Sequence, residues 1–108
     1  MREIHVQLQP DLVPDLVEAD TVARLEQIGR ATGAEVRTTA GFDEGRYVNL
    51  DFAPLDAAAL WNAIRMELES VPALARIAIV CCHGEHGWDD YSLLHHYDPA
   101  ESLDPFPP

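Results

Sequence analysis

Two segments of this chain alternate apolar and polar side chains with a period of two. In residues 3–9, EIHVQLQ, and residues 46–53, RYVNLDFA, an isoleucine, valine, leucine or phenylalanine occupies every second position. Successive side chains of a β-strand point to opposite faces of the sheet, so this pattern predicts strands with one buried and one wet face. The fold must therefore cover one side of a sheet and leave the other side open. On the polar side we expect His5 to be solvated.

Side chains at helical spacing run through residues 17–32 and predict a first helix. The preceding segment holds two prolines and repeats PDLV, so this helix begins either at Pro14 or after Asp20, which would serve as its N-cap. Gly33 is a natural end for it, because glycine readily adopts the left-handed conformation that follows many helices.

A second apolar stripe, over residues 60–71, predicts another helix, with Asp56 as its N-cap and Pro72 as its end. Between the two helices, the turn GFDEG is bounded by glycines and predicts a hairpin across residues 34–53.

The last third of the sequence predicts two more strands. RIAIVCC, residues 76–82, is a continuous apolar run that is typical of a strand covered on nearly both faces. YSLLHHY, residues 91–97, is a final strand. The register between them stays open, because a slip of one residue exchanges the faces; in one register Cys81 lies opposite Leu93 and Ile79 opposite His95.

The resulting order, β-α-β-β-α-β-β, predicts an α+β fold in which two helices cover one face of a mainly antiparallel five-stranded sheet. Its β-α-β-β-α-β core is the ferredoxin-like arrangement, with the fifth strand appended as an edge hairpin. Residues 1–98 form a single domain, and residues 99–108, which are acidic and contain four prolines, form an extended tail. Folds of this kind host many functions, so the fold alone does not define an activity.

Charge restricts the partners. The chain has nineteen acidic residues against seven arginines and no lysine, for a formal net charge of -12. Residues 77–108 carry six acidic residues and no arginine. Such a surface repels nucleic acid and anionic membranes, so we expect neither as a partner, and it suits a basic protein or a cation. No apolar run approaches the roughly 20 residues that span a bilayer, and the N-terminus lacks a signal-peptide pattern, so we expect a cytoplasmic protein.

The segment CCHGEHGWDDYSLLHH, residues 81–96, concentrates the reactive side chains. As a metal site, its best set is Cys81, His83 and His86, because thiolate and imidazole ligands suit Zn, Ni or Cu. The segment contains neither a CxxC nor an HxxxH pair. The alternative is a histidine-rich polar hairpin in which the cysteines pack as small hydrophobic residues.

Catalysis finds less support in the sequence. A Cys–His pair needs both side chains on one face, and the adjacent residues Cys82 and His83 point to opposite faces of a strand. No nucleophile elbow, phosphate-binding loop or zinc-protease motif is present. The sequence therefore favours a binding protein over an enzyme.

The same segment also predicts a partner-binding surface. Trp and Tyr are common anchors of protein interfaces, and carboxylates around them steer a basic partner. The predicted partner-binding residues are Glu85, His86, Trp88, Asp89, Asp90 and Tyr91. The alternative is that Trp88 folds back over the edge of the core.

These observations favour a small acidic protein-binding module, such as an immunity or antitoxin-type inhibitor of a basic protein. The alternative is a transition-metal-binding protein that uses residues 81–96. The last strand lacks the lysine or proline that usually protects a sheet edge, so a homodimer through this edge is a further candidate assembly.

Overall fold

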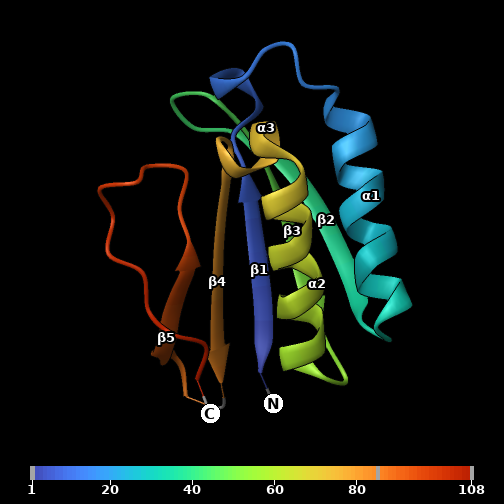
Figure 1. Cartoon of the computed structure of the whole chain (residues 1–108), viewed down its shortest axis with the longest axis vertical. Coiled ribbons are helices and arrows are strands. Elements are labelled where there is room, and N and C mark those ends of the chain that lie inside the picture. Colours follow the sequence, from blue (N-terminus) through green and yellow to red (C-terminus); the bar gives the residue numbers. More distant parts are fainter. Residues whose placement is uncertain (1, 85, 108) are drawn as a thin grey trace.

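The structure is a computed structural model that describes residues 2–84 and 86–107 (Figure 1). Within these residues one sheet contains β1 (Glu3–Leu8), β2 (Glu35–Phe42), β3 (Arg46–Ala53), β4 (Ala78–Gly84) and β5 (Gly87–His95). The strands lie in the order β2-β3-β1-β4-β5, and each neighbouring pair is antiparallel. The predicted α+β class with a five-stranded antiparallel sheet is confirmed.

The helices lie on one side of this sheet (Figure 1). The described chain contains the turn η1 (Pro10–Leu12) and the helices α1 (Glu18–Ala31), α2 (Ala57–Ser70) and α3 (Pro72–Ala75). None of the helices in this part of the chain is long and apolar enough to cross a membrane.

The core fills the space between the helices and the sheet. Its largest fully buried side chains are Phe52, Ile4, Leu8, Leu25, Leu50, Leu60, Ile64, Leu74, Ile77, Val6, Val80 and Cys82. Apart from Ile77, which lies between α3 and β4, these residues come from the sheet strands β1, β3 and β4 and from all three helices. Burial of this apolar surface is the main force that holds the helices to the sheet.

The first helix begins at neither of the two predicted positions. Val17 has an extended backbone, with φ -80° and ψ 99°, and helical geometry starts at Glu18. Asp20 thus lies inside the first turn rather than at the cap, where together with Glu18 it favourably meets the positive end of the helix dipole. At the other end, Gly33 has φ +81°, as predicted for a helix stop.

The second helix has the predicted cap. The carboxylate of Asp56 accepts a hydrogen bond of 3.0 Å from the backbone N–H of Ala59. The helix ends at Ser70, and Pro72 then opens α3, because proline is tolerated in the first turn of a helix.

The β4–β5 hairpin keeps the predicted pairing only in part. Cys81 lies opposite Leu93, but His95 lies opposite Val80 rather than Ile79. The register shifts between Val80 and Cys81, because two steps along β5, from His95 to Leu93, correspond to one step along β4. Such a β-bulge changes the pairing beyond it.

The segment after β5 returns along that strand. The backbone N–H of Leu93 donates to the carboxylate of Asp104 (2.9 Å), and the N–H of Asp104 donates to the carbonyl oxygen of Leu93 (2.8 Å). Phe106 packs against the core. The tail therefore occupies one position of the sheet edge that the sequence predicts to be unprotected, and the homodimer through that edge stays a prediction.

Candidate functional site

The face of the sheet turned away from the helices carries the polar side chains of the alternating strands. On β1 the residues Ile4, Val6 and Leu8 are buried, whereas Glu3 and His5 are partly exposed. β3 shows the same alternation. We call this surface the open face; its central side chains are Glu3, His5, Gln7, Asn49, Asp51, Ile79, Cys81 and His83.

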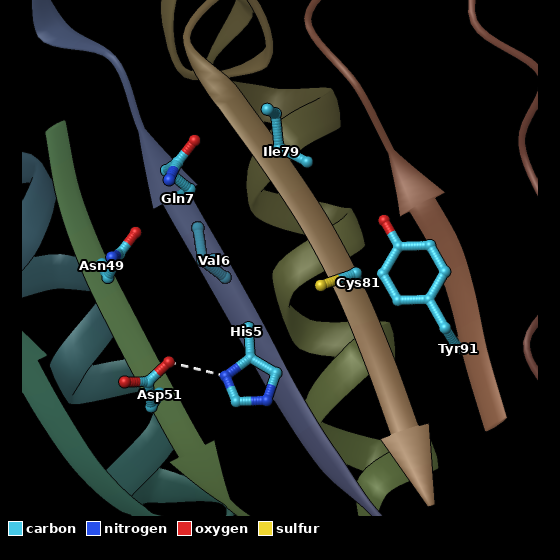
Figure 2. A pocket seen from close by; sticks show the side chains of 8 residues that line it. All are labelled: His5, Val6, Gln7, Asn49, Asp51, Ile79, Cys81 and Tyr91. Atoms are coloured by element: carbon cyan, nitrogen blue, oxygen red, sulfur yellow. Dashed lines mark hydrogen bonds and ion pairs between the residues drawn. The ribbon is translucent and has the colours of Figure 1, made fainter. Parts of the chain in front are cut away.

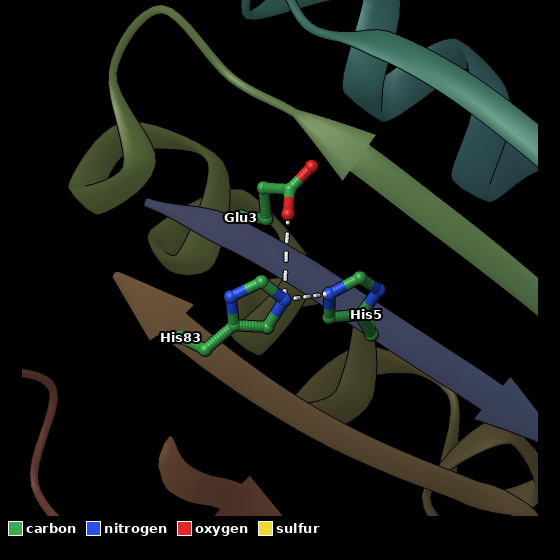
Figure 3. A group of neighbouring side chains, drawn as sticks. All are labelled: Glu3, His5 and His83. Atoms are coloured by element: carbon green, nitrogen blue, oxygen red, sulfur yellow. Dashed lines mark hydrogen bonds and ion pairs between the residues drawn. The ribbon is translucent and has the colours of Figure 1, made fainter. Parts of the chain in front are cut away.

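Glu3, His5 and His83 come together at one end of the open face (Figure 3). Glu3 lies directly opposite His83 in the β1–β4 register, and His5 is the diagonal neighbour of His83. The Nε2 atom of His83 is 2.7 Å from Nε2 of His5 and 3.3 Å from Oε2 of Glu3. The two imidazole rings stack, with centroids 4.7 Å apart and 17° between their planes. We call this group the Glu3–His5–His83 cluster.

Asp51 holds the ring of His5 from the neighbouring strand. It lies opposite His5 in the β1–β3 register, and its Oδ1 atom is 2.6 Å from Nδ1 of His5. An ionised carboxylate only accepts hydrogen bonds, so Nδ1 carries the proton and donates it. The neutral ring then presents the lone pair of Nε2 toward His83. The side chain of His5 is only 23% exposed, so the expectation of a solvated histidine is wrong.

The cluster offers a set of atoms that suits a transition metal. One ligand atom from each of its three residues lies within 4.8 Å of the other two. Two imidazole nitrogens and one carboxylate oxygen are ligands for zinc, nickel and copper ions. A carboxylate that orients the far nitrogen of a ligating histidine, as Asp51 does for His5, is a common second layer of such sites.

A pocket of about 380 Å³ lies beside the cluster on the same face (Figure 2). Asn49 and Asp51 on β3 border it on one side, and Tyr91 on β5 borders it on the other. The sulfur of Cys81 points from β4 toward β1, away from Tyr91. The pocket thus combines amide, carboxylate, phenol and thiol groups on an open surface.

Neither cysteine is activated as a nucleophile. Burial, with a further contribution from neighbouring Cys82, raises the pKa of Cys81 from 9.0 to about 11. Burial also raises the pKa of Cys82, which points into the core, and that of Tyr91. A thiol with a raised pKa stays protonated at neutral pH and is a poor nucleophile. The raised pKa therefore argues against a cysteine nucleophile on this face.

The structure does not bring the three sequence-predicted metal ligands together. His83 belongs to the cluster, but Cys81 borders the pocket instead. His86 is exposed in the turn between β4 and β5. Among the described residues, the group with metal-binding geometry takes its other two members from β1 rather than from the hairpin.

The predicted partner-binding residues have different surroundings. His86, Asp89 and Asp90 are exposed, and Tyr91 is 43% exposed beside the pocket. Glu85 and the side chain of Trp88 lie outside the described residues. The prediction that these residues bind a partner stays a prediction.

Sequence reasoning missed Glu3, His5 and Asp51 as site residues. One signal was present, because Glu3 and His5 are two residues apart in an alternating strand and must share its polar face. What was missing was the pairing, since only the position of β1 between β3 and β4 brings Asp51 and His83 to this pair.

Comparisons with protein-family models, with curated proteins and with solved structures found no match to this chain. The functional assignment therefore depends on the geometry of the open face.

Proposed function

We propose that this protein binds a transition-metal ion, of the zinc, nickel or copper group, through Glu3, His5 and His83. The observation that carries the proposal is the 2.7 Å contact between the Nε2 atoms of His5 and His83, with a Glu3 oxygen 3.3 Å from the second nitrogen. Two ring nitrogens at this distance need a shared proton between them, because two lone pairs repel each other. A metal ion that both nitrogens bind, from a position to one side of the line joining them, is the other arrangement that relieves this repulsion.

The surroundings of the cluster support this proposal. The side chains of His83 and His5 are 14% and 23% exposed, so neighbouring groups restrict their movement. Asp51 accepts a hydrogen bond from Nδ1–H of His5, which leaves Nε2 as the nitrogen that can bind a metal. The formal net charge of -12 raises the local concentration of cations around the protein.

Thermal unfolding with and without added metal tests the proposal. An ion that binds only the folded protein, at a free concentration of 100 times its Kd, stabilises it by about 2.7 kcal/mol. For a domain of this size that corresponds to a rise in Tm of roughly 10 °C. Purified protein stripped with a chelator should therefore show such a rise with Zn²⁺, Ni²⁺ or Cu²⁺. Unchanged melting curves with all three ions would mean that the two histidines share only a proton.

Single variants separate the cluster from the hairpin ligands that the sequence predicts. We expect His5→Ala and His83→Ala to lose the metal-induced rise in Tm. His86→Ala and Cys81→Ser should keep it, because neither residue belongs to the cluster. The reverse result, with binding lost in Cys81→Ser and retained in His5→Ala, would place the metal on the hairpin.

We also propose a second function, in which the acidic surface formed by residues 77–108 binds a basic protein, in the manner of an immunity or antitoxin-type inhibitor. This proposal is favoured by the distribution of charge. Residues 77–108 carry no arginine, and the exposed acidic residues described there are Asp89, Asp90, Asp98, Glu101 and Asp104.

Charge reversal of the hairpin tests this second function. A basic partner that copurifies with the protein should bind the double variant Asp89→Lys/Asp90→Lys more weakly, with the largest loss at low salt. The double variant Asp15→Lys/Glu69→Lys, at two exposed positions outside this region, makes the same change in net charge and is the matched control. Equal losses in both variants would assign the binding to net charge rather than to this surface.

We infer further that the fold is of the ferredoxin-like kind with β5 appended at one edge. The order of elements, β-α-β-β-α-β, and the order β2-β3-β1-β4 of the first four strands support this inference. An experimental structure in which β5 pairs with β2 rather than β4 would overturn it.

A further inference from the structure

A metal ion held by the Glu3–His5–His83 cluster would have coordination positions left over. Three protein ligands are fewer than the four to six that zinc, nickel and copper accept, and sites with three protein ligands keep a position for an exogenous group. The side chain of Glu3 is 45% exposed, so the cluster is open to solvent on this side. The exogenous ligand must therefore be compatible with the surface next to Glu3.

That surface is a hollow of about 310 Å³, separate from the pocket beside Tyr91. Glu3, His5 and Asp51 line it on the cluster side, and Glu35 and Arg37 line it on the side of β2. Arg37 lies opposite Asp51 in the β2–β3 register, and Asp51 lies opposite His5, so Arg37 and His5 belong to one row across three strands. The small side chain of Ala53 leaves room in the neighbouring row, beside Glu3.

Arg37 forms no ion pair with the described carboxylates of this acidic surface. Arg24, Arg46 and Arg65 each form an ion pair with a carboxylate. No ion pair joins Arg37 to a carboxylate of the described residues, although the hollow contains three of them. A guanidinium group in this position is available for a carboxylate of a ligand, which it can bind through two parallel hydrogen bonds.

Charge determines when such a ligand can enter. Glu3, Glu35, Asp51 and Arg37 give the hollow a formal charge of -2, which repels an anion. A divalent ion in the cluster brings this charge to zero, and a ligand with two negative charges then restores only the value of the metal-free hollow. An anion can therefore bind in this hollow only when the metal ion is already bound.

We propose that the metal-loaded protein binds a small dicarboxylate, with one carboxylate on the metal ion and the other on Arg37. Two carboxylates are needed because the ion and Arg37 lie on opposite sides of His5. Nε2 of His5 faces His83 on β4, whereas Arg37 lies two strands from His5 in the other direction, beyond Asp51 and roughly 10 Å from backbone to backbone. This inference rests on the proposed metal-binding function, and it adds the class of ligand and the residue that selects it.

Calorimetric titration of succinate into the zinc-loaded protein tests the inference, with acetate as the probe that has only one carboxylate. We expect succinate to bind at least about tenfold more tightly than acetate, which is the scale of one charge-assisted hydrogen-bond pair. Arg37→Gln should remove this difference while the zinc affinity stays unchanged. Arg30→Gln, an exposed arginine of α1, is the matched control and should retain the difference.

Each other outcome has a defined meaning. Zinc binding with equal affinities for succinate and acetate, or with a preference that survives Arg37→Gln, overturns this inference and leaves the metal site in place. Succinate binding to the metal-free protein overturns the requirement for the metal. Loss of zinc from the protein during the titration, measured after desalting, shows that succinate competes for the ion and also overturns the inference. Failure to bind zinc at all overturns the proposed function itself.

Discussion

Ile4 and His5 are neighbours in the chain and lie on opposite faces of the same strand. Ile4 is fully buried among the core residues beneath the helices, and His5 contacts Asp51 and His83 on the open face. The same contrast repeats along β3, where Phe52 is buried and Asp51 is half-exposed. One face of the sheet thus holds the fold together, and the other face carries the ionisable groups, so stability and binding depend on alternate residues.

The largest expected effect contrasts these two neighbours. Ile4→Ala should lower the free energy of unfolding by about 2–5 kcal/mol, because it removes buried methyl groups and leaves a cavity. His5→Ala should cost less than about 1 kcal/mol in the metal-free protein, because the ring is partly exposed and contributes one pair of polar contacts. Urea denaturation of both variants without metal measures the difference.

If His5→Ala proved as destabilising as Ile4→Ala, the two faces of the sheet would not differ in their contribution to stability. The Glu3–His5–His83 cluster would then be a structural element of the sheet. The converse result for metal binding, retained in His5→Ala and lost in a folded Ile4→Ala protein, would contradict the assignment of binding to the open face.

A smaller effect, on zinc affinity, distinguishes Asp51 from Asn49 within the open face. Asp51→Asn should weaken zinc binding by about 10–100-fold, the usual effect of changing a residue that orients a ligating histidine. Asn49→Ala is the control, since Asn49 lies two residues earlier on the same strand and face, opposite Gln7 rather than opposite His5. Zinc affinities that fall equally in both variants would indicate a general effect on the surface rather than orientation of the His5 ring.

The division between the faces could be predicted from the sequence, and so could most of the elements. Alternation at 3–9 and 46–53 identified β1 and β3, and Asp56 and Gly33 marked helix boundaries at the predicted places. These features depend on residues that are close together in the chain. The start of α1 was missed because no side chain caps it, so the sequence carried no signal for its first residue.

The cluster could not be predicted in the same way, because its members are far apart in the chain. His5 and His83 are 78 residues apart, and His5 and Asp51 are 46 apart. Their meeting requires β1 to lie between β3 and β4 in one particular register. The density of cysteine and histidine in residues 81–96 instead predicted a site within the hairpin, and of that segment only His83 belongs to the cluster.

The smallest effect concerns the two cysteines, which place the same chemical group on the two faces. Burial raises the pKa of Cys81 from 9.0 to about 11, so between these values the folded protein keeps a proton that the unfolded chain has lost. The free energy of unfolding should therefore be unaffected below pH 9 and fall as the pH rises from 9 to 11. Cys81→Ser should show a shallower fall, measured by urea denaturation across this range.

Alkylation with iodoacetamide distinguishes the two thiols directly. Cys81 borders the pocket on the open face, whereas Cys82 is completely buried in the core. Above pH 9, Cys81 should be modified first as its thiolate forms, and Cys82 should react only at the rate at which the protein opens. Fragmentation of the labelled peptide by mass spectrometry resolves the two positions. Equal rates at Cys81 and Cys82 would show that β4 opens as a unit before either thiol reacts, and the open face would then give its side chains no separate access to solvent.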